Sequence, residues 1–298
     1  MNELSVGLNT PTPVETIELF SKRYLLKRDD LIHPDFSGNK ARKFFSLLRS
    51  DLSGIRKVVS YGSNQSNAMY SLSVLARMKG WEFEYHVDHI PSYLKNNPIG
   101  NYRAALKNGA VFIEDGLKER VEFAEDTLFV EEGGRQKESE YGIAMLAREI
   151  SRWRTEHGVE KLSVFLPSGT GTTALYLRKH FFVTDDPISV YTTPCVGDSS
   201  YLRRQFSLLE PDSRYWPRIV DLSKKYHFGK LYREFYEIWI ELRKECGVEF
   251  DMLYDPKGWM VLRDLTEEID GEILYIHQGG IMGNESMLER YRRKYPSL

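Results

Sequence analysis

Short apolar runs alternate with stretches of helical periodicity along most of the chain. The apolar runs are rich in β-branched and aromatic residues, and they predict strands at residues 57–60, 83–87, 110–113, 128–130, 162–166, 188–192 and 273–276. Apolar positions recur at helical spacing over residues 40–52, 67–78, 141–154 and 231–246. Continuous apolar strands that alternate with helices predict an α/β protein whose sheets are mostly parallel.

Composition and charge exclude several classes of function. The chain has 298 residues, of which 41% are hydrophobic and 28% are charged, so it can bury a core. Its length suggests one large domain or two, at roughly 100–200 residues per domain. The 41 Lys and Arg residues nearly balance 43 Asp and Glu, which argues against nucleic acid as the main partner. No apolar run approaches the roughly 18 residues that a membrane helix needs, so no membrane partner is expected.

The cysteines and the first residues suggest a reducing setting. Cys195 and Cys246 are too few for a disulfide framework and lack zinc-ligand spacing. Residues 1–15 lack the basic start and apolar run of a secretory signal, so a cytoplasmic location is expected. His86 and His89 end a predicted strand without a third ligand cluster, which favours a polar strand end over a metal site.

The segment YGSNQSNA, at residues 61–68, joins a predicted strand to a predicted helix. Such a turn exposes backbone N–H groups and the positive end of the helix, which suits a carboxylate or a phosphate. The same Ser, Asn and Gln side chains could instead cap the helix by accepting from those N–H groups. From this turn alone, an anion site and a plain cap stay equally open.

The segment PSGTGTTA, at residues 167–174, makes a similar turn after the strand at 162–166. Its glycines let the backbone approach an anion, and its threonines supply hydroxyl donors. It partly matches the GxGxxA dinucleotide fingerprint, but the acidic residue expected about 20 residues later is missing. No lysine stands in a Walker position either. A phosphate site without a dinucleotide is the favoured interpretation, and a nucleotide-dependent oxidoreductase is the alternative.

Lys40 follows a Gly-Asn break at the start of a predicted helix. The positive end of a helix lowers the basicity of a lysine placed there, which favours its use as a nucleophile. A nucleophilic lysine together with a phosphate turn predicts pyridoxal 5'-phosphate, whose aldehyde needs a lysine and whose phosphate needs a helix N-terminus. Lys43, one turn later, is expected to face solvent or an anion.

Seven segments resemble, in order, motifs of the pyridoxal-phosphate family that contains 1-aminocyclopropane-1-carboxylate deaminase and D-cysteine desulfhydrase. Among these family motifs are GGNKTRK, GGxQSNH, LDPVYxGKAMxGL, and HTGG or HLGG. The segments of this chain are TPTPVE (10–15), KRDDL (27–31), SGNKARK (37–43), YGSNQSNA (61–68), EEGGRQ (131–136), FDMLYDPKGWMVL (250–262) and HQGG (277–280). The resemblance spans nearly the whole chain.

The resemblance implies the fold type II architecture of pyridoxal-phosphate enzymes, with the cofactor in the cleft between two three-layer α/β/α domains. Residues 1–44 and 151–298 would form the large cofactor-binding domain, and residues 45–150 a smaller inserted domain. It also implies a homodimer.

Roles for individual residues follow from the same resemblance. Lys40 would carry the cofactor as a Schiff base and move the α-proton of the substrate. Asn67 would bond the phenolic oxygen of the cofactor, and it would bind the substrate together with Gln65, Ser66 and Tyr254. Ser66, Tyr254 and Asp255 complete the catalytic set with Lys40. The remaining cofactor contacts would come from Ser168, Gly169, Thr170, Gly171, Thr172, Thr173 and Gln278.

Departures from the family motifs bear on the substrate. Deaminases of the family carry Glu after the motif tyrosine and Leu in HLGG, whereas desulfhydrases carry Ser or Thr and then Thr in HTGG. Asp255 and Gln278 fit neither pair. Ala68 stands where the family has His, and Phe228 aligns with a family tyrosine that Tyr226 could replace. The sequence therefore predicts a lyase or deaminase of a small amino acid, and a binding relic without turnover stays a further alternative.

Overall fold

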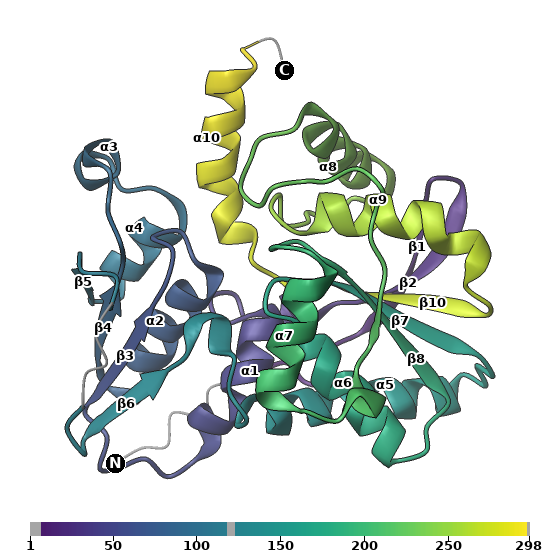
Figure 1. Ribbon diagram of the computed structural model, residues 1–298, viewed down its shortest axis with the longest axis horizontal. Helices are drawn as coiled ribbons and strands as arrows, with labels where there is room; N and C mark the ends of the chain where they lie inside the picture. The colour runs from purple at the N-terminus through teal and green to yellow at the C-terminus, as the bar shows by residue number, and fades with distance from the viewer. Residues whose placement is uncertain (1–6, 118–122, 297–298) are drawn as a thin grey trace.

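The strands of the protein form two separate sheets (Figure 1), in a computed structural model that describes residues 7–117 and 123–296. In the larger sheet the order is β1-β2-β10-β7-β8-β9, where β1 and β2 form an antiparallel hairpin and all other neighbours run parallel. Its strands are β1 (Val14–Leu19), β2 (Lys22–Lys27), β7 (Leu162–Ser168), β8 (Ile188–Pro194), β9 (Arg218–Ile219) and β10 (Glu272–Ile276).

The smaller sheet is entirely parallel, with the order β5-β4-β3-β6. Its strands are β3 (Lys57–Tyr61), β4 (Glu82–His86), β5 (Ala110–Ile113) and β6 (Thr127–Val130). Side chains of this sheet share one apolar core with helices α1 (Gly38–Arg49), α2 (Asn67–Lys79) and α4 (Gly100–Lys107). The mostly parallel α/β architecture predicted from the alternating pattern is confirmed.

The larger sheet is covered on both faces, which explains its continuous apolar strands. On one face, α5 (Ser139–Glu156) and α6 (Thr172–Val183) pack against Val164 and Leu166 of β7. On the other, α8 (Arg233–Cys246) and α9 (Asp255–Leu265) share a core with Phe165. Because successive side chains of a strand point to opposite faces, β7 contributes to both cores and has no exposed residue.

The other α-helices of the described residues are α3 (Ser92–Asn96), α7 (Ser199–Leu209) and α10 (Asn284–Lys294), and five 3-10 helices of three residues each lie between the longer elements. Helix α10 is joined to α4 by Glu285, whose carboxylate accepts the Gly100 N–H (3.0 Å) and pairs with Arg103 (2.7 Å). No helix in the described ranges is both long and apolar enough to span a membrane. Residues 1–6 of the N-terminal stretch lie outside the described residues, and the proposed domain boundaries stay a prediction.

Gly142 lets α5 pack closely on α1. A Cβ atom there would lie 2.0 Å from the Arg42 carbonyl oxygen and 2.8 Å from the Phe45 Cβ. Although alanine usually favours a helix over glycine by about 1 kcal/mol, we expect Gly142→Ala to lower the free energy of unfolding by about 1–3 kcal/mol, because the two backbones must separate. Gly54→Ala, with no atom within 4 Å of its new Cβ, is the control. Urea unfolding measures both, and equal stabilities would contradict the prediction.

Candidate active site

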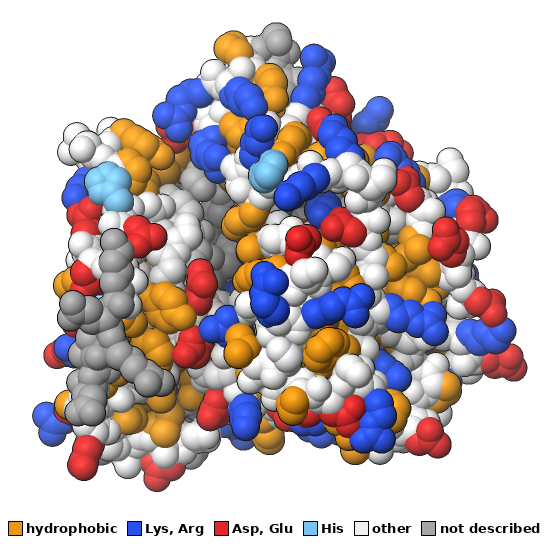
Figure 2. All heavy atoms as spheres, in the orientation of Figure 1, with side chains coloured by type: hydrophobic (Ala, Val, Ile, Leu, Met, Phe, Trp, Pro, Cys, Tyr) orange, Lys and Arg blue, Asp and Glu red, His pale blue; other side chains and the backbone are white. Residues whose placement is uncertain are grey.

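A cleft of about 550 Å³ lies where the carboxyl ends of β3, β7 and β10 meet the start of α1. Figure 2 shows the surface hollowed between the part that holds the small sheet and the part that holds the large one. Loops at the carboxyl ends of parallel strands are the usual ligand sites of α/β proteins. Every residue predicted for the site lines this cleft: Lys40, Gln65, Ser66, Asn67, Ser168, Gly169, Thr170, Gly171, Thr172, Thr173, Tyr254, Asp255 and Gln278.

Lys40 is held by a close contact between the start of α1 and the turn after β10. Gly38 has a φ of +62°, and a Cβ atom there would lie 1.7 Å from the Gln278 carbonyl oxygen, so only glycine fits. The Asn39 N–H donates to that oxygen (3.1 Å), and the Asn39 amide donates to Gln278 Oε1 (3.1 Å). Gln278 Nε2 in turn donates to the Pro167 carbonyl (2.7 Å). Gln278 therefore ties three cleft segments together.

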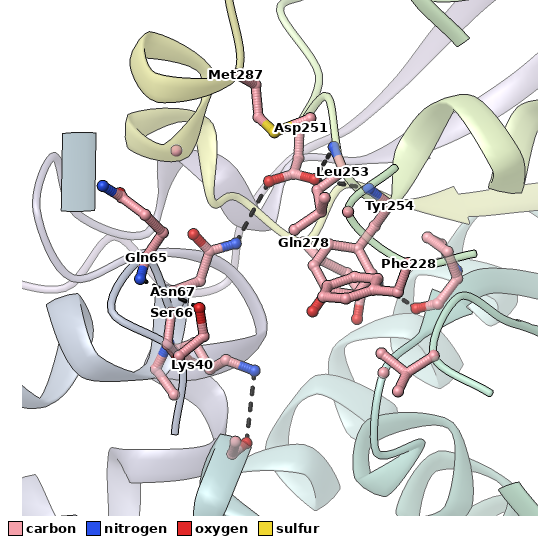
Figure 3. Close-up of a pocket in the computed structure, with 18 of the residues that line it drawn as sticks. Lys40, Gln65, Ser66, Asn67, Phe228, Asp251, Leu253, Tyr254, Gln278 and Met287 are labelled. Carbon is pink, nitrogen blue, oxygen red and sulfur yellow. Dashed lines mark hydrogen bonds between the residues drawn. The ribbon is translucent and has the colours of Figure 1, made fainter. Parts of the chain in front are cut away.

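The amine of Lys40 makes one long hydrogen bond, and its pKa is lowered. Its Nζ lies 3.5 Å from the Gly133 carbonyl oxygen (Figure 3). Burial lowers the pKa of Lys40 to about 8, and the nearby Asp251 and Glu132 carboxylates only partly counteract this. An amine with such a pKa is partly unprotonated near neutral pH, which a nucleophile requires.

Lys43 is buried, so solvent is not the neighbour that its side chain faces. Its Nζ donates to the Gly133 carbonyl (2.9 Å) and to Thr170 Oγ1 (3.4 Å), and only 2% of the residue is exposed. Within the described ranges no carboxylate pairs with it, and its pKa lies well below the usual range because of burial and the neighbouring Lys40 charge. A buried amine that faces this turn favours an anion between them.

The hydroxyl groups of the 167–174 turn are unequally engaged. Ser168 Oγ pairs with Thr192 Oγ1 (2.6 Å), and the Thr170 and Thr172 hydroxyls pair with each other (3.1 Å). Thr173 Oγ1 is buried without a partner within the described residues. No side chain caps α6, which begins at Thr172. The free hydroxyl and the uncapped helix end together suit a phosphate.

The two glycines of this turn have different neighbours. A Cβ atom at Gly169 would lie 3.4 Å from the Tyr254 ring, at the cleft wall. Gly171 has a φ of +72°, and a Cβ atom there would lie 2.4 Å from the Phe206 ring. A larger residue at Gly169 would narrow the cleft beside Tyr254. A larger residue at Gly171 would clash with Phe206 and distort the start of α6.

The 61–68 turn combines helix capping with open polar groups. Ser66 Oγ accepts the N–H groups of Ala68 (3.2 Å) and Met69 (3.4 Å), so it caps α2. Gln65 Nε2 donates to the Ile99 carbonyl (3.1 Å), whereas Gln65 Oε1 is buried without a partner in the described part of the chain. Helix capping therefore accounts for the serine at position 66, but it does not account for the buried Gln65 Oε1, unpaired among the described residues.

Asp251 also lines the cleft, although it was not among the residues predicted for the site. Its carboxylate accepts from Asn67 Nδ2 (3.3 Å) and from the N–H groups of Leu253 (2.7 Å) and Tyr254 (2.8 Å) (Figure 3). Burial raises the pKa of Asp251 to about 6. Asn67 Oδ1 accepts from Asn101 Nδ2 (2.6 Å), so the Asn67 amide is fixed from both sides. The FDMLY segment contained this signal, since its aspartate matches the motif aspartate of LDPVY.

Asp255 and Tyr254 face different surroundings. Asp255 Oδ1 accepts from the Tyr275 hydroxyl (2.6 Å) and Oδ2 from the Asp251 N–H (2.9 Å), and burial with the nearby Asp251 charge raises its pKa well above the usual range. The Tyr254 ring lies 5.3 Å from that of Phe228, which lines the cleft. The Tyr226 hydroxyl instead donates to Glu234 (3.2 Å), and Tyr226 is not among the residues that line the cleft.

Comparison with known proteins extends the motif resemblance to nearly the whole chain. No family model matches the chain. It is 23% identical to "Putative D-cysteine desulfhydrase 2, mitochondrial" of Oryza sativa subsp. japonica, over 92% of this chain and 81% of the relative. It is 24% identical to "Putative 1-aminocyclopropane-1-carboxylate deaminase" of Pyrococcus horikoshii, over 91% of this chain and 90% of the relative.

Solved structures with a similar fold include enzymes of the same kind. The crystal structure of an ACC deaminase homologue superimposes with a TM-score of 0.76 and 21% identity, covering 95% of this chain and 94% of the other. The crystal structure of a threonine deaminase from T.th. gives a TM-score of 0.65 and 14% identity over 90% and 92% of the two chains. The chain has the type II fold of pyridoxal-phosphate enzymes. The family resemblance read from the motifs is thereby confirmed.

The described part of this type II chain contains no cluster of three or more His, Cys, Asp and Glu that could hold a metal. His86 Nδ1 lies 2.7 Å from Asp115, and His89 Nδ1 lies 3.0 Å from Glu114. His86 also lies 3.0 Å from Glu84, and neither histidine is among the residues that line the cleft.

The low pKa of Lys40 predicts selective reactivity in the cofactor-free protein. An unperturbed lysine titrates near pH 10.4, whereas Lys40 is expected to reach half of its maximal reactivity near pH 8. The measurement is labelling by an amine-selective reagent across pH 6–11 (roughly the range between the two pKa values), with each lysine peptide quantified by mass spectrometry. The bulk of the surface lysines is the internal control, and a Lys40 profile that coincides with theirs would refute the assignment.

Proposed function

We propose that the protein is a pyridoxal 5'-phosphate-dependent lyase or deaminase that acts on a small amino acid, in the manner of D-cysteine desulfhydrase or 1-aminocyclopropane-1-carboxylate deaminase. The observation that carries this proposal is the joint placement, in one cleft, of an amine with a pKa of about 8 and an uncapped helix end with a free threonine hydroxyl. The names of the relatives support the same reaction class.

The residues present fit the cofactor. Lys40 would hold its aldehyde carbon, and Asn67, fixed by two neighbours, would donate to its phenolic oxygen. Thr173, Thr170 and the start of α6 would hold its phosphate, together with the Lys43 amine, which lies beside Thr170. When bound, the pyridoxal ring supplies an electron sink for carbanion chemistry.

The remaining groups would bind the substrate and move its proton. Gln65 and Ser66 lie at the start of α2, where the helix dipole favours the substrate carboxylate. Lys40, once free, would take the α-proton, which its pKa of about 8 permits near neutral pH. Burial raises the pKa of Tyr254, so its hydroxyl stays protonated and serves as a hydrogen-bond donor. Asp255 and Gln278 already have protein partners, and they would act by positioning Tyr254 and Lys40.

A panel of D- and L-amino acids tests this function directly. We expect release of a keto acid and ammonia from at least one small amino acid, and of sulfide as well if that substrate is cysteine. Protein incubated without added cofactor and then stripped with hydroxylamine is the control. Full occupancy by the cofactor without turnover of any member of the panel would favour the binding relic. Saturable NAD(P) binding without pyridoxal binding would favour the oxidoreductase.

We further propose that the protein is a cytoplasmic homodimer with two domains, residues 1–44 with 151–298 and residues 45–150. The cytoplasmic location rests on the cysteines, which are too few for a disulfide framework and are both unpaired. The dimer rests on the family resemblance alone. Sedimentation equilibrium of the purified chain distinguishes a mass near 34.7 kDa from twice that value.

A further inference from the structure

The cleft extends beyond the groups assigned to the cofactor, toward helix α10. Met287, Arg290 and Arg293 of α10 line this outer end, opposite Tyr93 of α3. Figure 3 shows Met287 on the far side of Asp251 from Lys40. A side chain that leaves the substrate α-carbon in this direction would therefore reach α10.

Arg290 has no acidic partner among the described residues. Its guanidinium donates to the Gly229 carbonyl (2.6 Å) and to the Met287 sulfur (3.1 Å), and no carboxylate of the described residues lies within 4.0 Å of it. The buried Arg42, by contrast, pairs with Asp29 (2.8 Å) and Glu149 (2.7 Å). A half-buried guanidinium that meets only a carbonyl and a thioether keeps N–H groups available for a planar anion.

Arg293 adds positive charge at the same end of the cleft. Its guanidinium lies 5.4 Å from the centre of the Tyr93 ring and 4.0 Å from the Glu289 carboxylate. It is more than half exposed, so solvent screens it, and Glu289 offsets part of its charge. Arg290 is consequently the stronger candidate for direct contact with a ligand.

Apolar side chains also line the cleft. Phe228, Leu253 and Met287 are among its lining residues, the Met287 sulfur contacts the Arg290 guanidinium, and Phe228 aligns with a family residue that carries a hydroxyl. This lining favours a short apolar linker in the substrate, with its polar group at the tip.

We propose that Arg290 binds an anionic group at the end of the substrate side chain, so that the site prefers amino acids with a distal carboxylate or phosphate to neutral ones of equal size. This inference rests on the proposed function, which puts the substrate amino and carboxylate groups at Lys40 and Gln65. The planar guanidinium matches a carboxylate or a phosphate in two parallel hydrogen bonds.

The test uses S-carboxymethylcysteine and its carboxamide analogue, in both D and L forms, which are nearly equal in size and differ in charge. With cofactor-loaded protein, we expect calorimetry to show about 10–100-fold tighter binding of the carboxylate. Arg290→Met is expected to bring that ratio close to one, and Arg290→Lys to reduce it in part. Arg292→Met, on the same helix but outside the cleft lining, is the matched control and should keep the wild-type ratio.

The results of this test distinguish failure of the Arg290 anion site from failure of the proposed function. A wild-type ratio near one, or a ratio unchanged in Arg290→Met, would overturn the anion site even if cysteine is consumed. Failure of the protein to bind the cofactor or to consume any amino acid would instead overturn the proposed function. Because calorimetry needs no turnover, the ratio still decides the role of Arg290 if the protein binds the cofactor but consumes no amino acid. Phosphoserine against serine provides the phosphate arm, with the same expected loss in Arg290→Met.

Discussion

Replacing Lys40 by alanine is expected to lower kcat for amino-acid breakdown by about 10³-fold or more, because one group supplies both the covalent attachment and the proton transfer. The α1 backbone around Lys40 is fixed by Gly38, Asn39 and Gln278, so the substitution should leave the fold intact. Circular dichroism checks the fold, and the initial rate of keto-acid formation measures the loss.

Lys43→Ala is the matched control for this prediction. Lys43 lies one turn away and contacts Thr170. Its loss should weaken cofactor binding by about tenfold or more, as expected for a lost charged hydrogen bond, while saturating cofactor restores most of kcat. Retention of more than about a tenth of the wild-type kcat in Lys40→Ala would contradict the nucleophile assignment, since general acid–base groups alone contribute about 10²-fold or more.

Arg42→Met is expected to lower the free energy of unfolding by about 3–5 kcal/mol, the usual cost of breaking a buried ion pair from one side. Arg42 lies on α1 beside the Lys40 segment and pairs with Asp29, which is fully buried, and with Glu149. Removing the guanidinium leaves the Asp29 carboxylate with Lys27 and the Thr12 hydroxyl as its remaining polar neighbours. Arg49→Met, at the exposed end of the same helix, is the control and should change stability by less than about 0.5 kcal/mol.

The pH dependence gives this network a second readout. Burial alone would raise the pKa of Asp29, but the Arg42 charge and hydrogen bonds outweigh it, so the pKa lies below its usual value. A carboxyl with a lowered folded-state pKa stabilises the protein above its unfolded value, near about 3.9, and this stabilisation is lost as the pH falls through the folded-state pKa. The stability gap between wild type and Arg42→Met should therefore narrow below about pH 4. A gap that stays constant on acidification would contradict this account.

The sequence predicted the interior strands well and the edge of the large sheet poorly. Strands covered on both faces, such as β7, carry continuous apolar runs that have few alternatives. The hairpin β1–β2 was missed because charged residues interrupt the apolar runs of VETIEL and KRYLLK, which leaves no continuous apolar stretch of strand length. Helix α9 was not predicted because Pro256 and Gly258, near its start, weaken the helical pattern of the sequence. Helix α10 was not predicted either.

Some residues of the candidate site could likewise be predicted from the sequence, and others could not. The predicted site residues all line one cleft, and those at 65–67, 168–173 and 278 do so because they end or follow strands whose carboxyl ends face it. Asp251 was overlooked although the FDMLY segment matches a motif aspartate, whereas the roles of Lys43 and Arg290 come from burial or from missing partners, which no local pattern encodes. Lys43 looks like an ordinary surface lysine in the sequence, yet it is 2% exposed and faces Thr170.

Reduction with borohydride after addition of pyridoxal 5'-phosphate tests the central claim most directly. The account predicts a visible absorption band that disappears on reduction, with one equivalent of cofactor fixed on the peptide that contains Lys40. Fixation on another lysine, including Lys43, or a protein that stays colourless and unlabelled, would contradict it.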